Sequence, residues 1–237
     1  MEGIILAGGF GTRLRPRVHH VPKPMAPIAG KPFLYWLLDR LAQNQFRRVV
    51  LSVGYKKSTI IEDLGSRYAN IDLAYAVEDL PLGTGGAIKH ALKLLDPRLG
   101  IVCVMNGDTI STLRYREMYL AHATSAAQVT MALIRVANAS RYGTVALRDH
   151  RVIGFAPRGK CGAGLINVGT YMIDPLVFTT AEWPDTFSFE QDFLPSAVDS
   201  INIHAFETEG WFLDIGVPED FDRAQTELPA EFARLTS

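Results

Sequence analysis

The residues best suited to chemistry lie in a glycine turn close to the N-terminus. Three glycines occupy residues 8–11, directly after an apolar run at residues 3–6, and Arg13 and Lys23 follow the turn. Glycine lets the backbone turn tightly, and successive N–H groups can then point at one anion because no Cβ stands in the way. Together with the two cations, this segment predicts a site that holds a polyphosphate and stabilises charge during phosphoryl or nucleotidyl transfer.

Two other phosphate-binding motifs and a plain turn compete with this interpretation. A Rossmann dinucleotide fingerprint would need a third glycine where this chain has Leu14. No Gly-x-x-x-x-Gly-Lys-Ser/Thr run is present, which argues against a P-loop NTPase. An ordinary strand-to-loop turn is the remaining alternative for residues 8–11. Arg13 and the Pro-Lys-Pro-Met run at residues 22–25 favour the phosphate site.

The elements that position the turn alternate between apolar runs and amphipathic segments in the first half of the chain. This alternation predicts a parallel sheet covered by helices on both faces, with ligands at the carboxyl ends of the strands. The glycine turn follows the first strand, and residues 106–108 (Asn-Gly-Asp) follow the last. The expected strands are residues 3–6, 48–53, 73–77 and 101–105, and the expected helices are residues 33–43, 59–68 and 86–95.

The second half of the chain is richer in extended runs separated by turn residues. They predict mixed or antiparallel strands that continue the first sheet, because no linker rich in Pro, Gly or Ser separates the halves. Pro218 suits the first turn of a closing helix over residues 218–228. The expected strands here are residues 128–136, 144–148, 152–155 and 165–173.

Composition indicates a globular protein without a strong charge bias. Apolar residues make up 48% of the 237 residues and the net charge is −1, so neither disorder nor a general affinity for nucleic acid is expected. Cys103 and Cys161 lack metal-ligand spacing and are expected to be reduced thiols, which suits the cytoplasm. No run approaches 18 apolar residues and no leader opens the chain, so neither a membrane span nor a secretion signal is expected.

Seven segments together resemble the sugar-1-phosphate nucleotidylyltransferases, and within that family they are most similar to the D-glycero-α-D-manno-heptose 1-phosphate guanylyltransferases. The first segment, IILAGGFGTRLRPRVHHVPKPMAPIAGKP, is the most specific, and the similarity extends over almost the whole chain. The segments are residues 4–32, 82–87, 106–108, 140–143, 164–169, 187–190 and 212–220.

The resemblance implies an α/β fold of the nucleotide-diphospho-sugar transferase type. This is a Rossmann-like mixed, mainly parallel sheet with helices on both faces, plus a small β-rich sugar-binding portion. We expect one domain over residues 1–237, with a nucleotide-binding portion at about 1–127. A sugar-phosphate-binding portion and the closing helix then occupy about 128–237. Longer relatives carry a C-terminal regulatory or acyltransferase domain, which we do not expect here.

The resemblance also assigns the catalytic and metal residues. Arg13 and Lys23 would be catalytic, with Lys23 near the phosphates of both reactants, where an ammonium can draw two anions together. Asp108 and Asp214 would hold Mg²⁺, which prefers hard oxygen ligands. The alternatives are a solvated loop lysine for Lys23 and a turn or helix cap for Asp108.

For the nucleotide, the resemblance points to the glycine turn and to a second loop near residue 83. Glu78 stands where relatives place a base-reading side chain. Its carboxylate can only accept hydrogen bonds, which suits the N1–H and N2–H₂ donors of guanine better than a pyrimidine. A solvated loop acid is the alternative for Glu78. The expected nucleotide-binding residues are Leu6, Gly8, Gly9, Gly11, Thr12, Arg13, Glu78, Gly83 and Thr84.

For the sugar phosphate, the family motifs point to Gly143, Arg158, Asn167 and Glu190. Asn167 can donate and accept, and Glu190 can accept from two hydroxyls, as polyol recognition requires. Glu190 could instead be an acid at a helix start. Pro157-Arg158 replaces the usual Glu-Lys of the family, so Arg158 keeps the positive charge while one sugar contact is put in doubt. Lys160 is an alternative ligand for the phosphate.

We therefore expect a Mg²⁺-dependent sugar-1-phosphate nucleotidylyltransferase that uses GTP and a heptose or mannose-like 1-phosphate. Its NDP-sugar would feed the assembly of surface polysaccharide or glycoprotein. Two alternatives stay open: a uridylyl- or other pyrimidine nucleotidylyltransferase on the same scaffold, and a catalytically silent nucleotide-sugar sensor. The expected partners are the nucleoside triphosphate and the sugar 1-phosphate, with no nucleic acid and no membrane, in a cytoplasmic monomer or homodimer.

Overall fold

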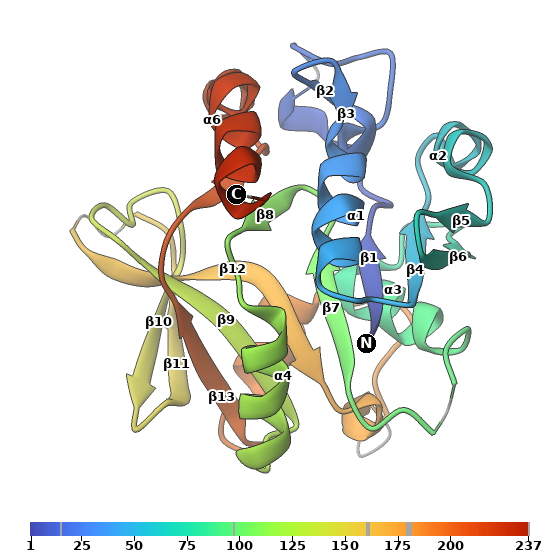
Figure 1. Ribbon diagram of the computed structural model, residues 1–237. Coiled ribbons are helices and arrows are strands. Elements are labelled where there is room, and N and C mark those ends of the chain that lie inside the picture. The colour runs from blue at the N-terminus through green and yellow to red at the C-terminus, as the bar shows by residue number, and fades with distance from the viewer. Residues whose placement is uncertain (15, 97, 160–161, 179–181, 237) are drawn as a thin grey trace.

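A single ten-stranded mixed sheet runs through both halves of the chain (Figure 1). The computed structural model describes residues 1–14, 16–96, 98–159, 162–178 and 182–236. In chain order the strands of this sheet are β1 (Glu2–Leu6), β4 (Arg48–Val53), β5 (Arg67–Tyr68), β6 (Ile71–Val77), β7 (Val102–Asn106), β9 (Val129–Val136), β10 (Thr144–Arg148), β11 (Arg151–Ala156), β12 (Gly164–Ile173) and β13 (Ile203–Thr208). They lie side by side in the order β10-β11-β13-β9-β12-β7-β1-β4-β6-β5.

Short elements and helices surround this sheet. Two small ribbons pair β2 (Pro27–Ile28) with β3 (Lys31–Pro32), and β8 (Thr109–Ser111) with β14 (Phe212–Asp214). The α-helices are α1 (Phe33–Gln43), α2 (Lys57–Leu64), α3 (Gly83–Leu92), α4 (Tyr115–Thr124), α5 (Leu194–Ala197) and α6 (Pro218–Thr236). Single turns of 3₁₀ helix are η1 (Thr12–Leu14), η2 (Lys23–Met25) and η3 (Pro175–Phe178), and η4 (Phe189–Phe193) is a π-helix.

The first half of the sheet is parallel, as the sequence predicts. Strands β7, β1, β4 and β6 pair in parallel, and Gly3 lies opposite Val49 on one side and Cys103 on the other. Such strands are buried on both faces, which explains why they consist of nearly continuous apolar residues. Their carboxyl ends meet at one edge, where β1 leads into the glycine turn.

Helices cover both faces of this sheet, which confirms the predicted architecture. Ile5 of β1 belongs to the core under α1, α4 and α6, whereas its neighbour Ile4 belongs to the core under α3, α5 and η4. Successive strand residues point to opposite faces, so one strand supplies both cores. Figure 1 shows α1 and α4 on the near side of the sheet.

The second half extends the same sheet in antiparallel fashion. Strand β12 pairs with β7, with Thr170 opposite Met105, and then with β9 on its other side. Strands β9 and β13 are parallel to each other, while β10 and β11 form an antiparallel hairpin. The predicted mixed sheet is therefore confirmed, and its parallel pairs are those of the first half together with β9 and β13.

One predicted helix is too long. The helix expected over residues 59–68 runs over Lys57–Leu64, and Arg67–Tyr68 instead form β5, an antiparallel edge strand beside β6. Gly65 has a φ of 63° and its N–H donates to the carbonyl of Ile61 at 3.0 Å. A glycine in this left-handed conformation ends a helix, because it satisfies a free carbonyl while turning the chain.

The closing helix is longer than expected. It continues from the predicted end at Leu228 through Pro229 to Thr236. Proline inside a helix removes one backbone hydrogen bond. Here Ala224, Leu228 and Phe232 lie four residues apart and are all buried against the core. Burial of this apolar stripe offsets the cost of the proline.

The helix α4 and the strand β13 were not predicted from the sequence.

No helix among the described residues is both long and apolar enough to cross a membrane. Cys103 is a buried free thiol in β7, and burial raises its pKa above the ordinary value. Cys161 lies outside the described residues.

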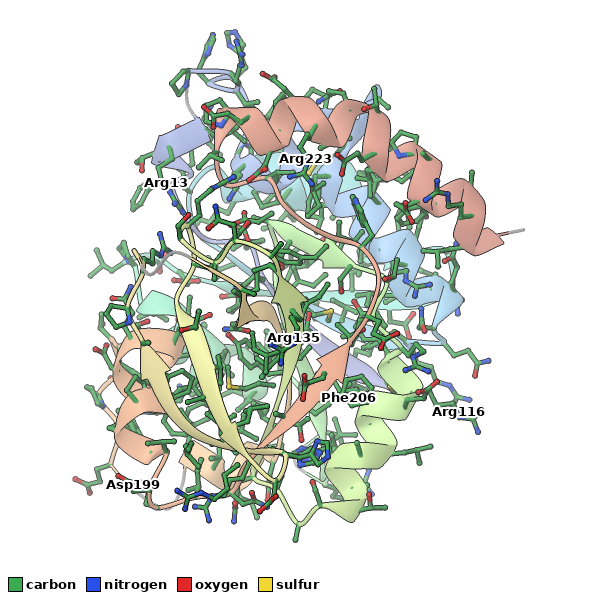
Figure 2. All side chains as sticks on the ribbon, turned by 90° about the vertical axis from the view of Figure 1, so that its left-hand side faces the viewer. Arg13, Arg116, Arg135, Asp199, Phe206 and Arg223 are labelled. Carbon is green, nitrogen blue, oxygen red and sulfur yellow. The ribbon has the colours of Figure 1, made fainter. Side chains whose placement is uncertain are left out.

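The buried carboxylate of Asp220 links α6 to the β-rich second half of the chain through ion pairs. Its carboxylate accepts from Arg141 at 2.5 Å and from Arg223 at 3.0 Å, and the residue is only 2% exposed. Two residues further on, Asp222 pairs with Arg17 at 2.7 Å, but both of these side chains are about half exposed. Figure 2 shows α6 with Arg223 at the same end of the molecule as Arg13, above the strands that carry Arg135 and Phe206.

We expect Asp220→Ala to lower the free energy of unfolding by about 2 kcal/mol, because hydrogen bonds to a buried charge are among the stronger ones. Asp222→Ala is the matched control in the same helix, and its exposed pair should contribute about 0.5 kcal/mol or less. Urea denaturation followed by circular dichroism measures both values. Equal losses in the two variants would contradict this account.

Candidate active site

Two adjoining pockets lie at the carboxyl ends of β1 and β7 and share Leu6, Gly9 and Asp108. We call them the Lys23 pocket and the Glu78 pocket. The Lys23 pocket is lined by Leu6, Ala7, Gly9, Gly11, Thr12, Arg13, Lys23, Pro24, Gly107, Asp108 and Gly216. The Glu78 pocket is lined by Leu6, Gly8, Gly9, Phe10, Glu78, Pro81, Gly83, Thr84, Ala87, Asn106 and Asp108. Every predicted nucleotide-binding residue therefore lines one continuous cleft.

The glycine turn presents unused backbone donors to this cleft. The N–H groups of residues 9–13 donate to no group in the part of the chain that the structure describes. Gly11 has a φ of 58°, and a Cβ built on it would lie 2.8 Å from the Cβ of Lys23. The turn therefore requires glycine at this position, both for its conformation and for the close approach of the lysine.

The two predicted metal ligands come together through a short ribbon of two strands. Strand β14 pairs with β8 so that Asp214 lies opposite Thr109, and the N–H of Ile215 donates to the carbonyl of Asp108 at 3.0 Å. This pairing brings two carboxylates that are far apart in sequence to the mouth of the glycine turn. The structure therefore brings the glycine turn, the two cations and the two acids together, as predicted.

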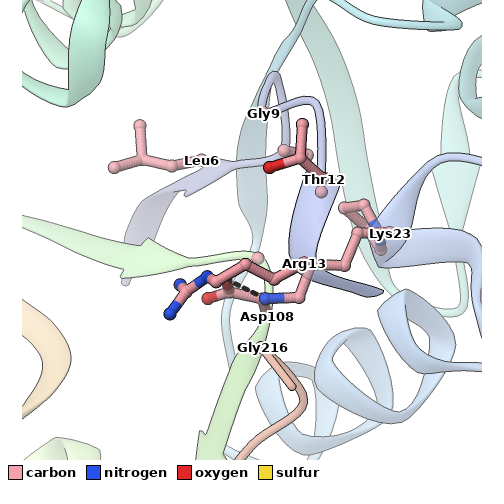
Figure 3. Close-up of a pocket in the computed structure, with 11 residues that line it drawn as sticks. Leu6, Gly9, Thr12, Arg13, Lys23, Asp108 and Gly216 are labelled. Atoms are coloured by element: carbon pink, nitrogen blue, oxygen red, sulfur yellow. Dashed lines mark hydrogen bonds and ion pairs between the residues drawn. The ribbon is translucent and has the colours of Figure 1, made fainter. Parts of the chain in front are cut away.

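Lys23 lies between these two acids. Its Nζ is 2.5 Å from Oδ2 of Asp108 and 3.8 Å from Oδ1 of Asp214, and its side chain is only 9% exposed. Figure 3 shows the pair with Asp108 and shows the Arg13 side chain running beside it. Arg13 itself is exposed. The alternative of a solvated loop lysine is wrong for Lys23.

The surroundings of Asp214 disfavour its negative charge. Burial and then the nearby charge of Asp108 raise the pKa of Asp214, against the opposing effects of Lys23, the N–H of Gly216 and Arg13. Two carboxylates this close favour an added cation. Hard carboxylate oxygens are the ligands that Mg²⁺ prefers, so the donor set fits that ion. Among the described residues no group of three or more His, Cys, Asp or Glu is arranged to hold a metal, so other ligands would have to complete the shell.

Glu78 is held in place by donors of the protein. Its Oε1 accepts from the hydroxyl of Ser52 at 2.7 Å, and its Oε2 accepts from the N–H of Leu82 at 3.1 Å. The alternative of a solvated loop acid is therefore wrong. Each carboxylate oxygen keeps a further lone pair that can accept from a ligand in the Glu78 pocket.

The glycines of the second loop have a packing role in the structure. A Cβ on Gly85 would lie 2.1 Å from the ring of Phe187, and one on Gly83 would lie 2.4 Å from the Phe187 carbonyl. These glycines let the start of α3 pack against the segment that leads into η4.

A chain of hydrogen bonds links this second loop to the predicted sugar residues. The hydroxyl of Thr84 donates to Oε2 of Glu190 at 2.7 Å, and the buried Tyr171 hydroxyl donates to Oε1 of Glu190 at 3.2 Å. The amide of Asn167 donates to the same Tyr171 hydroxyl at 2.5 Å. Burial, followed by the charge of Glu190, raises the pKa of Tyr171, so the phenol stays a donor. Glu190 lies in the first turn of η4, and it is also a member of this series of hydrogen bonds.

Gly143 and Arg158 lie apart from the two pockets. Gly143 directly precedes β10, whose first residue, Thr144, pairs with Ile166 of β12, the neighbour of Asn167 in sequence. Arg158 is exposed just beyond β11 and makes no ion pair within the described residues. Lys160, the alternative phosphate ligand, lies outside the described residues.

Several residues of the site were missed by the sequence reasoning. Tyr171 carried no signal of its own, because its link to Asn167 depends on an irregularity in the β9–β12 register between these two residues. Three of the missed residues, Asn106, Gly107 and Gly216, lie inside segments that resemble the family. Their place in those segments was the signal that could have identified them. Phe10, half exposed beside the Glu78 pocket with its ring against Tyr55, was also overlooked.

Comparison with known proteins agrees with this geometry. The family model described as "Nucleotidyl transferase" matches residues 2–231. The chain is 42% identical to the D-glycero-alpha-D-manno-heptose 1-phosphate guanylyltransferase of Aneurinibacillus thermoaerophilus, over 96% of this chain and 98% of that protein. It is 32% identical to the mannose-1-phosphate guanyltransferase of Debaryomyces hansenii, over 93% of this chain and 62% of that protein.

Among solved structures, HddC from Yersinia pseudotuberculosis complexed with GMP-PN superposes with a TM-score of 0.85 and 36% identity, over 95% of this chain and 98% of that one. A putative glucose-1-phosphate thymidylyltransferase from Bacillus anthracis superposes with a TM-score of 0.78 at 22% identity, over 96% of this chain and 95% of that one. The second likeness concerns the fold alone.

We expect Asp214→Asn to stabilise the ligand-free protein by about 1 kcal/mol at neutral pH, because the native site disfavours the charge of the wild-type carboxylate. A raised carboxyl pKa means that the native state prefers the protonated form, so wild-type stability falls as the pH rises through that pKa. The advantage of the variant should therefore shrink as the pH falls toward the ordinary range of aspartate. Urea denaturation at several pH values measures it, and a variant less stable than wild type at neutral pH would refute the argument.

Proposed function

We propose, since the chain belongs to the nucleotidyl transferase family, that it transfers a guanylyl group from GTP to a sugar 1-phosphate and releases pyrophosphate. The observation that carries this proposal is the convergence of the free backbone donors of the glycine turn, Arg13, Lys23 and two carboxylates on one cleft. The relatives named as guanylyltransferases, over nearly the full length of both chains, support the choice of base.

The reaction needs positioning and charge neutralisation more than covalent chemistry. An oxygen of the sugar 1-phosphate attacks the α-phosphorus of the triphosphate in line, the bond to the β-phosphate oxygen breaks, and pyrophosphate leaves. The N–H groups of residues 9–13 and the Arg13 guanidinium would bind the triphosphate. Lys23, whose stem lies against Gly11, would neutralise the phosphates as the two reactants approach.

Asp108 and Asp214 would hold a Mg²⁺ ion in this reaction. When bound, such an ion screens the phosphate oxygens and polarises them. The ribbon of β8 and β14 orients the two carboxylates for this task, and the N–H of Gly216 fixes Oδ1 of Asp214 at 2.7 Å.

Glu78 would read the guanine base. Ser52 and Leu82 hold its carboxylate at the wall of the Glu78 pocket, where its free lone pairs can accept from the N1–H and N2–H₂ of guanine. HddC, which superposes on this chain, was solved with a guanine nucleotide, and that complex supports the same choice. Gly83 and Thr84 would line the pocket beside the nucleotide.

Glu190 and Asn167 would bind the hydroxyls of the sugar, together with Gly143, which directly precedes β10. The proposed sugar is D-glycero-α-D-manno-heptose 1-phosphate, by likeness to the relatives of matching length, with mannose 1-phosphate as the related candidate. Arg158 would meet the phosphate of the sugar with its guanidinium. Residues 1–127 would thus serve the nucleotide, and residues 128–237 the sugar phosphate. We place the enzyme in the cytoplasm as a monomer or homodimer.

The test of this function is pyrophosphate release across a matrix of GTP, ATP, UTP, CTP and dTTP against heptose, mannose and glucose 1-phosphates, with and without Mg²⁺. We expect Mg²⁺-dependent release that is highest for GTP with the manno-configured sugars. Preference for UTP or dTTP would favour the pyrimidine alternative. Tight binding of nucleotide sugars without any release would favour the sensor.

We expect Glu78→Gln to lower the ratio of kcat/KM for GTP over UTP by about tenfold or more, since an amide offers one acceptor in place of two, and a charged hydrogen bond is worth about 1.5–3 kcal/mol. Asp79→Asn is the matched control: Asp79 is the next residue, is exposed and pairs with Lys57. Steady-state kinetics with both nucleotides measure the ratio. An unchanged ratio in Glu78→Gln would remove this residue from base recognition.

A further inference from the structure

Lys23 occupies the position between Asp108 and Asp214 that a metal ion would need. We propose that Lys23 is the resident counter-cation of this acid pair in the ligand-free protein, and that it must be drawn away by the triphosphate before both carboxylates can face a metal ion. This inference rests on the proposed function and deepens it, because it assigns Lys23 a role in the order of binding as well as in the reaction.

The contacts of Lys23 are those of a partly buried ion pair. Its Nζ bonds Oδ2 of Asp108 at 2.5 Å and lies 3.8 Å from Oδ1 of Asp214, the same oxygen that accepts the N–H of Gly216. The lysine side chain is 9% exposed, whereas Asp108 and Asp214 are 35% and 26% exposed. A buried ammonium is costly unless it is paired, so the free protein gains by keeping Lys23 on the acids.

An ammonium and a divalent ion cannot share this position comfortably. Both would compete for Oδ2 of Asp108, and their mutual repulsion at a few ångströms inside a cleft is strong. The other cation of the pocket, Arg13, is exposed and makes no ion pair with either acid among the described residues. Within the described part of the chain, Lys23 is therefore the one cation that blocks the carboxylate pair by contact.

The triphosphate can release this block because the glycine turn and Lys23 touch. The Cβ of Lys23 would lie only 2.8 Å from a Cβ on Gly11, so the lysine stem rests on the turn whose N–H groups are free. Phosphates bound by these donors would offer oxygens to Nζ, and the long lysine stem can swing its ammonium to them. The carboxylates would then lose their internal cation at the moment when phosphate oxygens arrive.

The consequence is positive coupling between nucleotide and metal. Each should bind more tightly in the presence of the other, and the ligand-free protein should bind metal poorly. Premature occupation of the acid pair by free metal ions is thereby limited. This coupling distinguishes Lys23 from a lysine that only stabilises the transition state.

The experiment measures binding of Mn²⁺ alone to the full-length protein, with neither nucleotide nor sugar, by the electron paramagnetic resonance signal of free Mn²⁺. Lys23→Met removes the charge but keeps an unbranched side chain that is only one atom shorter, and it should tighten Mn²⁺ binding by about tenfold or more over wild type. Lys57→Met, which breaks the exposed pair with Asp79, is the control for loss of one lysine and should leave binding unchanged. Arg13→Met removes a charge from the same pocket but leaves Lys23 between the two acids. It should therefore tighten Mn²⁺ binding less than Lys23→Met does.

Lys23→Gln repeats the test should Lys23→Met fail to fold, since the amide can still donate to Asp108. The proposal is overturned if Mn²⁺ binds the folded Lys23 variant no more tightly than wild type. It is also overturned if Arg13→Met tightens binding as much as Lys23→Met, because the cause would then be the overall charge of the pocket. Pyrophosphate release by wild type tests the proposed function separately, since Mn²⁺ binding involves no turnover.

Discussion

The pairing of β8 with β14 is the constraint on which the rest of the site depends. It brings Asp108, from the end of the parallel half, and Asp214, from the approach to α6, onto one cation. Charges separated by more than a hundred residues interact strongly only when the backbone holds them at contact distance in a partly dry cleft. Asp220 and its two arginines then hold the start of α6, which follows β14 in the chain.

A second connection joins the two halves of the cleft through polar groups. Thr84, Glu190, Tyr171 and Asn167 form one hydrogen-bonded chain that runs from the start of α3 to β12. Buried polar groups are stable only when they are satisfied, so each member of this chain limits the positions of the next. The proposed base-binding and sugar-binding walls would thus be parts of one network, which would help to align the two substrates for in-line transfer.

Much of this could be predicted from sequence where local rules govern the outcome. The glycine turn, α1 and the buried parallel strands follow from spacing and composition, and the structure has them nearly residue for residue. The error at residues 59–68 arose because helical periodicity continued past Gly65, where the left-handed backbone conformation ends the helix. The error at the end of α6 has the opposite cause, since tertiary burial of Leu228 and Phe232 overrode the local effect of Pro229.

By itself, the sequence determined the family, the order of the elements and the residue types that carry charge, because motifs and periodicity are local properties of the chain. Only the tertiary structure decided that Lys23 is buried on both acids, that Glu78 is held by Ser52, and that Gly85 makes room for Phe187. Each of these facts is a contact between segments distant in sequence. Such contacts depend on the register and packing of the whole sheet, which no local pattern specifies.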